Sequence, residues 1–581
     1  MTPDPIGHPT ARKPIRLWPG VVIVILLCLI RFVVPAVVPG AHVLGMLGGL
    51  AGGVLVILWW VFFSRAPWLE RLGAVALIAV AMVATRRILH ESIASGMMGM
   101  MFYILAPPFL GLAFVAWAVA TRHRPDGARR VSMVATVLLA CGAWALFRTG
   151  GITGEADSDF HWRFTQTPEE RLLAGSLEAP EAPAAGAGET QTEAEWPGFR
   201  GPERDGVVRG ARIDTDWAVA PPVELWRRPI GPGWSSFAVR GDVFYTQEQR
   251  GDDEVVSCYR LASGEPVWRH ADAARFWESN GGAGPRATPT LSDGRVYTLG
   301  ATGIVNALEA GDGAVVWSRN AAADTERKTP GWGFASSPLV VHDLVVIATA
   351  GVLVAYDAAT GDRRWVGETR GFGYSSPHRM TLDGVDQILL LDGLGAVGVA
   401  PAEGKLLWEH RWQGDGIVQP ARTADGDVLI GTGSGLGSGA GIGVRRLAVA
   451  QGASGWTVEE RWTSTGLKPY FNDFVVHEGY AFGFDGGILS CIDLADGRRR
   501  WKGGRYGHGQ MVLLADQGLL LVLSEKGELA LVGATPSGFT ELARFKAIEG
   551  KTWNHPVLVG DVLLVRNDQE MAAFRLSRAS G

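Results

Sequence analysis

Five long apolar stretches open the chain and predict five membrane-spanning helices. They lie at 19–38, 42–63, 72–88, 97–120 and 131–147, and each is long enough, or nearly so, to cross a hydrocarbon core of about 30 Å. The first stretch resembles a signal peptide in length. Because four further spans follow it and no convincing small-residue cleavage site is present, we expect it to be retained. Residues 1–148 are therefore interpreted as a five-helix transmembrane anchor.

Basic residues in the short loops predict the orientation of this anchor. Nine Lys and Arg precede the first span or lie in the loops after the second and fourth spans, whereas four lie on the alternate side. Cytoplasmic loops carry the excess of Lys and Arg. The N-terminus is therefore expected in the cytoplasm and everything after Phe147 outside it. In a bacterium the anchor would lie among inner-membrane lipids and the rest of the chain in the periplasm.

Residues 149–195 are predicted to form a periplasmic helix and a flexible acidic linker. Thr167, Pro168 and Glu170 stand at the cap, first and third positions of a helix start, so we expect a short helix to about Ala174. The following stretch, LEAPEAPAAGAGETQTEAE at 177–195, has almost no large apolar side chain. Such a composition cannot bury a core and is typical of a spacer.

From Trp196 to the C-terminus one unit recurs. Its five clearest copies end at Trp268, Trp317, Trp365, Trp408 and Trp501, each with a glycine four residues earlier and a small residue ten residues earlier. The glycine predicts a positive-φ turn between two antiparallel strands. The small residue leaves room where strands crowd, and the tryptophan is expected to pack between neighbouring blades. Weaker copies end at Trp462 and Phe545.

The spacing of these units predicts a closed β-propeller. An alternating strand such as DLVVIATA precedes each unit, and copies recur at an interval that suits a four-stranded blade. The last copy stops before any Trp strand, whereas an orphan Trp strand around Trp226 opens the domain. Pairing that strand with the one near Phe574 would close a ring of eight blades over 196–581. The predicted fold is thus an α-helical membrane domain followed by an all-β eight-bladed propeller.

The repeats resemble those of pyrroloquinoline quinone (PQQ) propellers. The stretch Ala355-Tyr-Asp-Ala-Ala-Thr-Gly361 with Trp365 carries the typical pattern almost intact. Two kinds of protein share such propellers: quinoprotein dehydrogenases, including membrane glucose dehydrogenases with five N-terminal spans, and the non-catalytic outer-membrane assembly lipoprotein BamB with its relatives. The opening WPGFRGPERDG at 196–206 resembles the start of other PQQ-like proteins and adds no chemistry of its own.

Charge and cysteine content narrow the function. Residues 1–148 hold thirteen Lys and Arg against four Asp and Glu, so the exported part must be strongly acidic to give the overall net charge of −5. An acidic domain is a poor partner for nucleic acid, and we exclude that class. Cys258 and Cys491 occupy the same repeat position in different blades, so they are expected to be small buried residues without a disulfide.

The segments that enter the innermost strands are unusually polar, and such strands line the central channel of a propeller. They supply these candidate ligands: Trp234, Arg286, His378, Gln419, Asn472, Asp473, His508, Gln510, Trp553, Asn554 and His555. The resemblance implies a PQQ site in which the quinone stacks on Trp234 or Trp553, Arg286 polarises a quinone oxygen and Asp473 is the catalytic base. Asn472 or Asn554 would help to hold Ca²⁺. The alternative is that these side chains satisfy one another and channel waters.

Two departures from the dehydrogenases favour the alternative. The chain has no vicinal Cys-Cys pair, and Asp473 is the only obvious carboxylate in the ring. We therefore predict a binding or scaffold module for a protein or small ligand at the cell envelope. A PQQ-dependent dehydrogenase that passes electrons to membrane quinone remains the second hypothesis. The Gly-rich stretch at 431–443 lacks a phosphate-loop ending and is expected to be a loop in the fifth blade.

Overall fold

The structure, a computed structural model, describes residues 15–38, 41–154, 157–175, 193–434 and 441–579. It divides into two compact units. Met1–Thr165 together with Ser279–Gly281 form the first unit, and Gln166–Glu278 with Gly282–Gly581 form the second. The division along the chain at Thr165 falls inside the segment predicted to be a linker.

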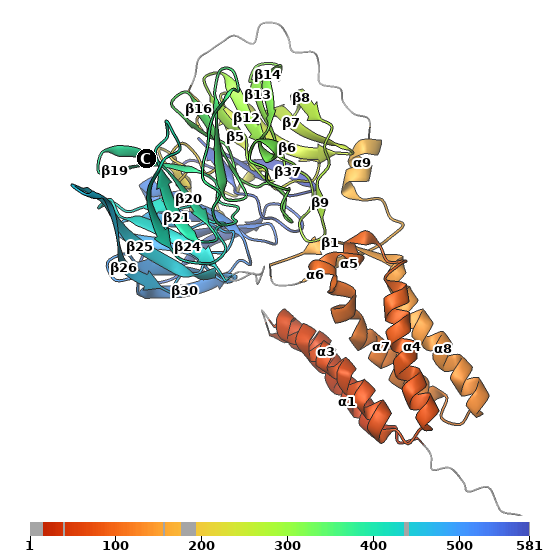
Figure 1. Cartoon of the computed structure of the whole chain (residues 1–581). Coiled ribbons are helices and arrows are strands. Elements are labelled where there is room, and N and C mark those ends of the chain that lie inside the picture. The colour runs from red at the N-terminus through yellow and green to blue at the C-terminus, as the bar shows by residue number, and fades with distance from the viewer. Residues whose placement is uncertain (1–14, 39–40, 155–156, 176–192, 435–440, 580–581) are drawn as a thin grey trace, which may run out of the picture. The chain divides into compact units, whose positions relative to one another are not determined.

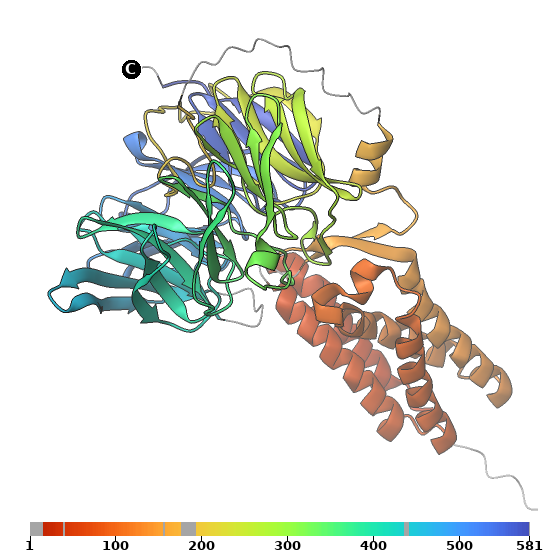
Figure 2. The same ribbon diagram turned by 45° about the horizontal axis from the view of Figure 1, so that its top comes forward.

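Among the described residues of the first unit, five helical segments are long and apolar enough to cross a membrane, as predicted (Figures 1 and 2). The first comprises α1 (Trp18–Cys28), a π-helical turn (Leu29–Val33) and α2 (Val34–Val37), and the second comprises α3 (His42–Leu58) with a π-helical turn (Trp59–Phe63). The others are α4 (Trp68–Thr85), α7 (Met101–Ala120), and α8 (Asp126–Gly142) with a 3₁₀ turn (Ala143–Leu146). Glycines of α3 let it pack closely: a Cβ on Gly53 would lie 2.7 Å from Pro107 of α7.

The third and fifth spans begin a turn or more earlier than the hydrophobic pattern indicated. Both early turns contain charged residues, so the hydrophobic pattern indicated a loop there. The structure keeps these turns helical because the charges pair: the buried carboxylate of Glu70 accepts hydrogen bonds from Arg129 at 2.6 Å and Arg130 at 3.0 Å. This contact joins α4 to α8.

Between the spans and the propeller the chain forms elements that were only partly predicted. Helix α5 (Glu91–Ala94) was missed, as was a hairpin of β1 (Phe147–Ile152) and β2 (Ser158–Trp162). The fourth span was predicted to begin at Met97, but 97–99 belong to a separate short helix, α6 (Gly96–Gly99), and α7 begins at Met101. The predicted helix α9 (Pro168–Ala174) is present with its full capping box, in which Glu170 N–H donates to Thr167 Oγ1 at 3.0 Å. Linker residues 176–192 lie outside the described residues.

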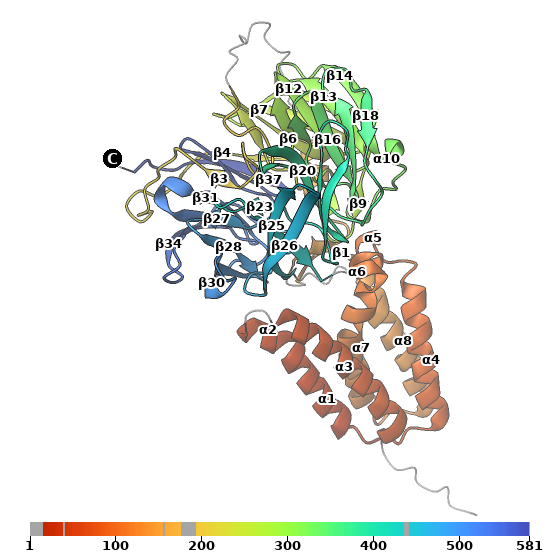
Figure 3. The same ribbon diagram turned by 60° about the vertical axis from the view of Figure 1, so that its left-hand side comes forward.

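The second unit is a ring of eight blades (Figures 1 and 3). Blade one consists of β5 (Ala238–Arg240), β6 (Val243–Arg250), β7 (Asp253–Arg260) and β8 (Pro266–Asp272), and blade two of β11 (Thr290–Ser292), β12 (Arg295–Leu299), β13 (Ile304–Glu309) and β14 (Val315–Asn320). Blade three consists of β15 (Leu339–Val341), β16 (Leu344–Thr349), β17 (Val352–Asp357) and β18 (Arg363–Val366), and blade four of β19 (His378–Leu382), β20 (Val385–Asp392), β21 (Gly395–Val399) and β22 (Leu406–Arg411). Blade five consists of β23 (Ala421–Arg422), β24 (Val428–Gly433), β25 (Gly441–Gly452) and β26 (Gly455–Ser464), and blade six of β27 (Val475–His477), β28 (Tyr480–Asp485), β29 (Ile488–Asp493) and β30 (Arg499–Arg505). Blade seven contains β31 (Gln510–Leu514), β32 (Leu519–Leu523), β33 (Glu528–Gly533) and β34 (Glu541–Lys546), and blade eight consists of β35 (Val557–Val559), β36 (Val562–Arg566), β37 (Glu570–Arg575) and β4 (Val223–Pro229). Outside the blades, β9 (Trp277–Glu278) pairs with β10 (Gly282–Ala283), and helix α10 (Ala321–Asp324) follows β14.

The ring closes as predicted. β4 completes blade eight by antiparallel pairing with β37, in a register that sets Trp226 opposite Ala573. Strand β4 thereby lies beside β37, the last strand of the chain (Figure 3). Closure leaves no sheet edge open between the first and last blades, which protects the strands from pairing with other chains.

The repeated tryptophans join neighbouring blades, and the repeated glycines explain how. Trp317 of blade two donates its indole N–H to Ala358 O of blade three at 3.0 Å. Its ring lies against Gly361, where an added Cβ would be 2.6 Å from the ring and φ is +71°. The predicted positive-φ turn is therefore also a contact with the preceding blade. The small residue ten before each tryptophan pairs with that tryptophan across the strands, as Ala355 does with Trp365.

Blade five departs from this pattern. Its β25–β26 hairpin is longer than those of its neighbours, and Trp408 of blade four donates instead to Gln387 Oε1 at 2.7 Å within its own blade. Residues 435–440 of the Gly-rich stretch lie outside the described residues. Cys258 and Cys491 are buried and unpaired, as expected.

Candidate functional site

Hydrogen bonds join four pairs of neighbouring blades at the position two residues before the innermost strand begins, and we call these residues the belt. At this position the backbone N–H of one blade donates to a side chain of the next. The bonds are Ser236 to Thr288 at 3.0 Å, Thr288 to Ser337 at 3.0 Å, Ser337 to Ser376 at 2.9 Å, and Gln419 to Asp473 at 2.6 Å. Ser236 Oγ also donates to His555 O at 2.7 Å across the closing blades. The small polar residues of the ring therefore satisfy the backbone of their neighbours.

Asp473 is the belt residue of blade six. Its Oδ1 accepts from Gln419 N–H as Ser337 accepts from Thr288 N–H. Its Oδ2 lies 3.7 Å from Arg200 Nε and 3.6 Å from His555 Nε2. Burial raises the pKa of Asp473, and the Arg200 charge and the Gln419 N–H act against that rise. One oxygen of the carboxylate thus accepts a belt hydrogen bond, and the other faces a guanidinium group.

The opening segment 196–206 supplies that guanidinium, a role that the sequence did not reveal. Arg200 donates to Phe474 O at 2.7 Å. Arg204 donates to Pro338 O at 2.7 Å and Ser337 O at 3.1 Å. The segment therefore contacts blades three and six. Both arginines have positive φ, a conformation that costs free energy and persists where surrounding contacts fix it.

Two predicted histidine ligands lie beside this segment and are held neutral. Burial first, and then the nearby guanidinium groups, lowers the pKa of His378 to about 3, and burial with Arg200 does the same for His555. The His555 ring packs edge-on against Phe199 at 5.2 Å. At neutral pH these imidazoles carry no charge.

Aromatic side chains gather where the chain enters the innermost strands. Trp234 and Trp553 have ring centroids 4.7 Å apart, and Phe471 lies 5.2 Å from Trp553 and stacks on His508 at 5.2 Å. Trp553 Nε1 donates to Glu525 Oε1 at 2.7 Å, and Lys551 Nζ lies 4.5 Å from the Trp553 ring. The two predicted stacking platforms therefore contact each other.

Arg286 is held by its own loop and by the backbone of Trp332 in the loop that enters blade three. It donates to Gly282 O at 2.9 Å, Ala283 O at 3.0 Å and Trp332 O at 3.2 Å, and Nη2 lies 3.5 Å from Glu278. Burial lowers its pKa to about 10, against the effect of Glu278. Within the described residues, no hydrogen bond or ion pair joins Arg286 to Asp473. The roles predicted for these two residues in catalysis stay predictions.

The residues around the belt do not match the shell that Ca²⁺ requires. Ca²⁺ takes six to eight oxygen ligands. Asn472 Oδ1 accepts from Tyr470 N–H, and Asn554 donates to Ser235 O, which leaves Asn554 Oδ1 and Gln510 Oε1 without a partner among the described residues. A guanidinium already faces the Asp473 carboxylate, and it would repel a cation. No group of three His, Cys, Asp or Glu in the described chain is placed to hold a metal.

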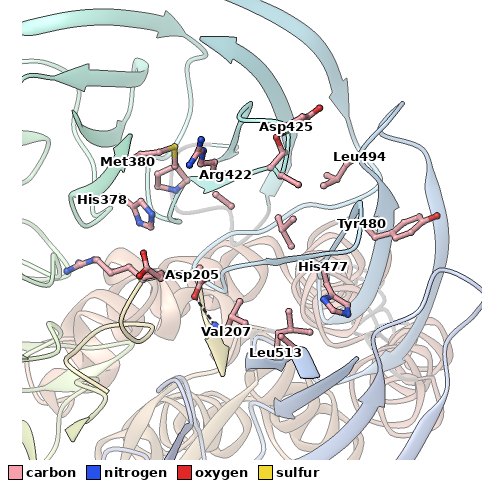
Figure 4. Close-up of a pocket in the computed structure, with 18 of the residues that line it drawn as sticks. Asp205, Val207, His378, Met380, Arg422, Asp425, His477, Tyr480, Leu494 and Leu513 are labelled. Atoms are coloured by element: carbon pink, nitrogen blue, oxygen red, sulfur yellow. Dashed lines mark hydrogen bonds between the residues drawn. The ribbon is translucent and has the colours of Figure 1, made fainter. Parts of the chain in front are cut away.

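A bowl of about 1030 Å³ lies beside the opening segment (Figure 4). Side chains of the opening segment and of several blades line it, among them Asp205, His378, Arg422, His477 and Tyr480. Its wall includes β3 (Val207–Val208), which pairs in parallel with β31 as a fifth strand of blade seven. The antiparallel course of each blade places the bowl's turns, such as 423–425, on the face opposite to the loops that enter the innermost strands.

Comparison with known proteins relates the repeats to one family. Residues 252–502 match the family model described as outer membrane protein assembly factor BamB. The chain is 34% identical over 110 residues to outer membrane protein assembly factor BamB of Shewanella oneidensis, which is 18% of this chain and 26% of that protein. The match spans about a quarter of the length of this curated relative.

Solved structures with a similar course include BamB from Moraxella catarrhalis, at 14% identity and a TM-score of 0.42 over 62% of this chain and 99% of that one. A quinohemoprotein alcohol dehydrogenase from Pseudomonas putida HK5 has 14% identity and a TM-score of 0.45, over 67% of this chain and 81% of that one. These similarities concern the fold of the propeller and do not assign an activity to this chain.

Proposed function

We propose that the propeller is a non-catalytic binding module of the cell envelope. In this proposal the five helices hold it in a bacterial inner membrane among lipids, with the N-terminus in the cytoplasm and the propeller in the periplasm. Its bowl takes an extended segment of an envelope protein. One observation carries the proposal: the bowl already contains an extended segment of this chain, β3, paired with the innermost strand β31.

The pairing of β3 indicates how a partner would bind. Strand addition uses the free N–H and C=O groups of a sheet edge, and specificity comes from neighbouring side chains. Among the described residues, blade seven alone has a fifth strand on its inner edge. The next inner strand, β27, carries Val476 and His477 into the lining of the bowl. Its channel-side edge is the one we assign to the partner.

The bowl also provides a charge for recognition. Arg446 is bound by Asp425 and Asp427, and Arg379 by Asp386. Arg422 is exposed and makes no hydrogen bond or ion pair with any residue that the structure describes. An acidic side chain on the partner would pair with it.

The first experiment places a photo-crosslinking amino acid at Arg422 in the full-length chain in cells. We expect a discrete crosslinked protein whose crosslinked peptide is an acidic, extended segment. The control position is Arg498, whose side chain is 86% exposed but lies outside the lining of the bowl. Equal crosslinking at both positions, or none at 422, would refute the bowl as the binding site.

A second experiment tests the dehydrogenase hypothesis, in which PQQ and Ca²⁺ would bind and membrane quinone would accept electrons. The purified full-length protein is incubated with PQQ and Ca²⁺, and its melting temperature and dye reduction are measured. Ligand at a hundredfold excess over its dissociation constant would stabilise the fold by about 2.7 kcal/mol. We expect no shift and no reduction, and a PQQ-dependent shift with turnover would establish the dehydrogenase instead.

A fusion experiment tests the proposed orientation. A reporter that works only after export, fused after Gly581, should be active, because the basic residues flanking the spans favour a cytoplasmic N-terminus. Activity of a reporter that works only in the cytoplasm at this position would reverse the topology.

A further inference from the structure

Three loops of blades three and four repeat one short pattern, a large apolar residue between two glycines. They are Gly331-Trp332-Gly333, Gly371-Phe372-Gly373 and Gly393-Leu394-Gly395. All three apolar side chains are exposed to solvent, Trp332 by 38%, Phe372 by 52% and Leu394 by 41%. We call them the apolar rim. Exposed apolar side chains that gather in one place mark an interaction surface.

The three loops that carry these side chains contact one another. Phe372 packs edge-on against Tyr374 at 5.0 Å, and the Tyr374 hydroxyl is hydrogen-bonded to the backbone of Trp332. A Cβ on Gly371 would lie 2.6 Å from Leu394 N, and one on Gly393 would lie 2.9 Å from Phe372 O. The flanking glycines thus allow the loop backbones to pack against one another, and the single large side chain of each loop points outward.

The rim lies on a defined face of the propeller. Trp332 and Phe372 belong to loops that enter innermost strands, and Leu394 belongs to the turn between the second and third strands of blade four. In an antiparallel blade these connections share one face, which we call the entry face. The turn between β6 and β7 is on it too. Helix α9 is fixed to that turn, since Glu169 accepts from Gly251 N–H at 3.0 Å and from Arg275 at 2.8 and 2.9 Å.

The chain therefore reaches the propeller on the face that carries the rim. Only Gln166 and Thr167 separate the helical unit from α9. That unit holds five helices long and apolar enough to cross a membrane, so a bilayer is always within the reach of a short tether. Tryptophan and phenylalanine partition into the interfacial region of bilayers, and basic residues accompany them there. Lys328 in the Trp332 loop and Arg411 at the end of β22 are exposed.

We propose that the apolar rim docks on the surface of a lipid bilayer and inserts Trp332, Phe372 and Leu394 into its headgroup region. This gives the propeller a membrane contact in addition to its covalent tether. It does not depend on what occupies the bowl.

The test uses the full chain in nanodiscs that contain anionic lipid. An environment-sensitive NBD fluorophore is attached at Phe372→Cys in a Cys28→Ser background, since the three remaining cysteines are buried. We expect blue-shifted emission and at least threefold stronger quenching by lipids carrying a headgroup-level spin label than at the control. The control is Val315→Cys, which has similar exposure (50%) but lies at the start of β14, on the opposite face.

Quenching at position 372 that is no stronger than at position 315 would overturn the proposal. Blue-shifted emission that ignores the lipid quencher but depends on protein concentration would also overturn it, in favour of a second copy of the chain. A variant with Trp332→Ser and Leu394→Ser in the labelled protein provides a check on folding. These side chains are exposed, so its melting temperature should stay within about 2 °C, while quenching at position 372 should fall by at least half.

Discussion

Arg200 Nε lies 3.7 Å from Asp473 Oδ2, and the two side chains are 2% and 5% exposed. The contact links the segment that opens the propeller to blade six, two residues before its innermost strand begins. Asp473 was the one carboxylate that the sequence offered as a catalytic base. In the structure its Oδ2 faces the Arg200 guanidinium, and its Oδ1 accepts the hydrogen bond from Gln419 N–H of blade five.

Asp473→Asn should therefore destabilise the propeller. The substitution removes the negative charge that faces Arg200 and leaves a buried cation without compensation, at a cost of about 1–3 kcal/mol or more. Chemical unfolding followed by tryptophan fluorescence measures the loss. Adding Arg200→Met should recover part of it, because the stranded charge is then gone. Asp242→Asn is the control, since that side chain is 84% exposed, and equal stability of the two single variants would contradict the structural role.

Gly361→Ala should be more harmful than Gly384→Ala. Both glycines have φ near +75°, with values of +71° and +77°, so both substitutions carry similar backbone strain of about 1 kcal/mol. They differ in surroundings: a Cβ at 361 would meet the Trp317 ring at 2.6 Å, whereas nothing lies within 4 Å of one at 384. The difference in unfolding free energy measures the contact between blades. If the two variants lose the same stability, the glycine serves only the turn.

Deleting residues 221–230 should open the ring. The deletion removes β4, the outer strand of blade eight, and exposes the edge of β37. We expect a large fall in melting temperature of the whole propeller and a rise in aggregation. Deleting 180–189, ten residues of the linker, is the control of equal length. If the propeller that lacks β4 melts at the same temperature as the intact chain, closure of the ring contributes little to its stability.

The fold was predictable from the sequence because its signals are periodic and local. Apolar runs gave the five spans, and the Gly and Trp spacing gave eight blades and the partner of the Trp226 strand. The capping box of α9 is also local, with Thr167 and Glu170 three residues apart. The early turns of α4 and α8 were missed because Glu70 is stabilised by arginines far away in sequence.

The site was less predictable for the same reason. The polar segments around the channel were identified, but the belt that joins Gln419 to Asp473 depends on neighbouring blades. The opening segment carries two arginines whose partners, Pro338 and Phe474, follow more than a hundred residues later. A single sequence has no signal for such a contact. The glycine-flanked apolar residues of the rim can be read in the sequence, but their proximity depends on the fold, which brings the loops of Phe372 and Leu394 together.

Glu254→Gln should change how stability depends on pH. Glu254 begins the buried part of β7, where Oε1 accepts from Ala301 N–H at 3.0 Å and Oε2 has no hydrogen-bond partner among the described residues. Burial raises its pKa to about 7. In the unfolded chain the group titrates near its usual pKa of about 4.3. Between these values the folded state binds more protons than the unfolded state, so stability falls as pH rises to about 7 and then levels off.

The glutamine variant carries no such charge. At pH 8 it should therefore be more stable than the natural chain by about 1–3 kcal/mol, and near pH 5 the two should differ little, because Glu254 is then protonated in the folded state. Urea unfolding at both pH values gives the comparison. Glu265→Gln, at a side chain 57% exposed, should show no gain at pH 8. A Glu254→Gln variant that is less stable than the natural chain at pH 8 would mean that the carboxylate is ionised and compensated in the fold, for example by Arg286, whose charge already acts against the rise in pKa.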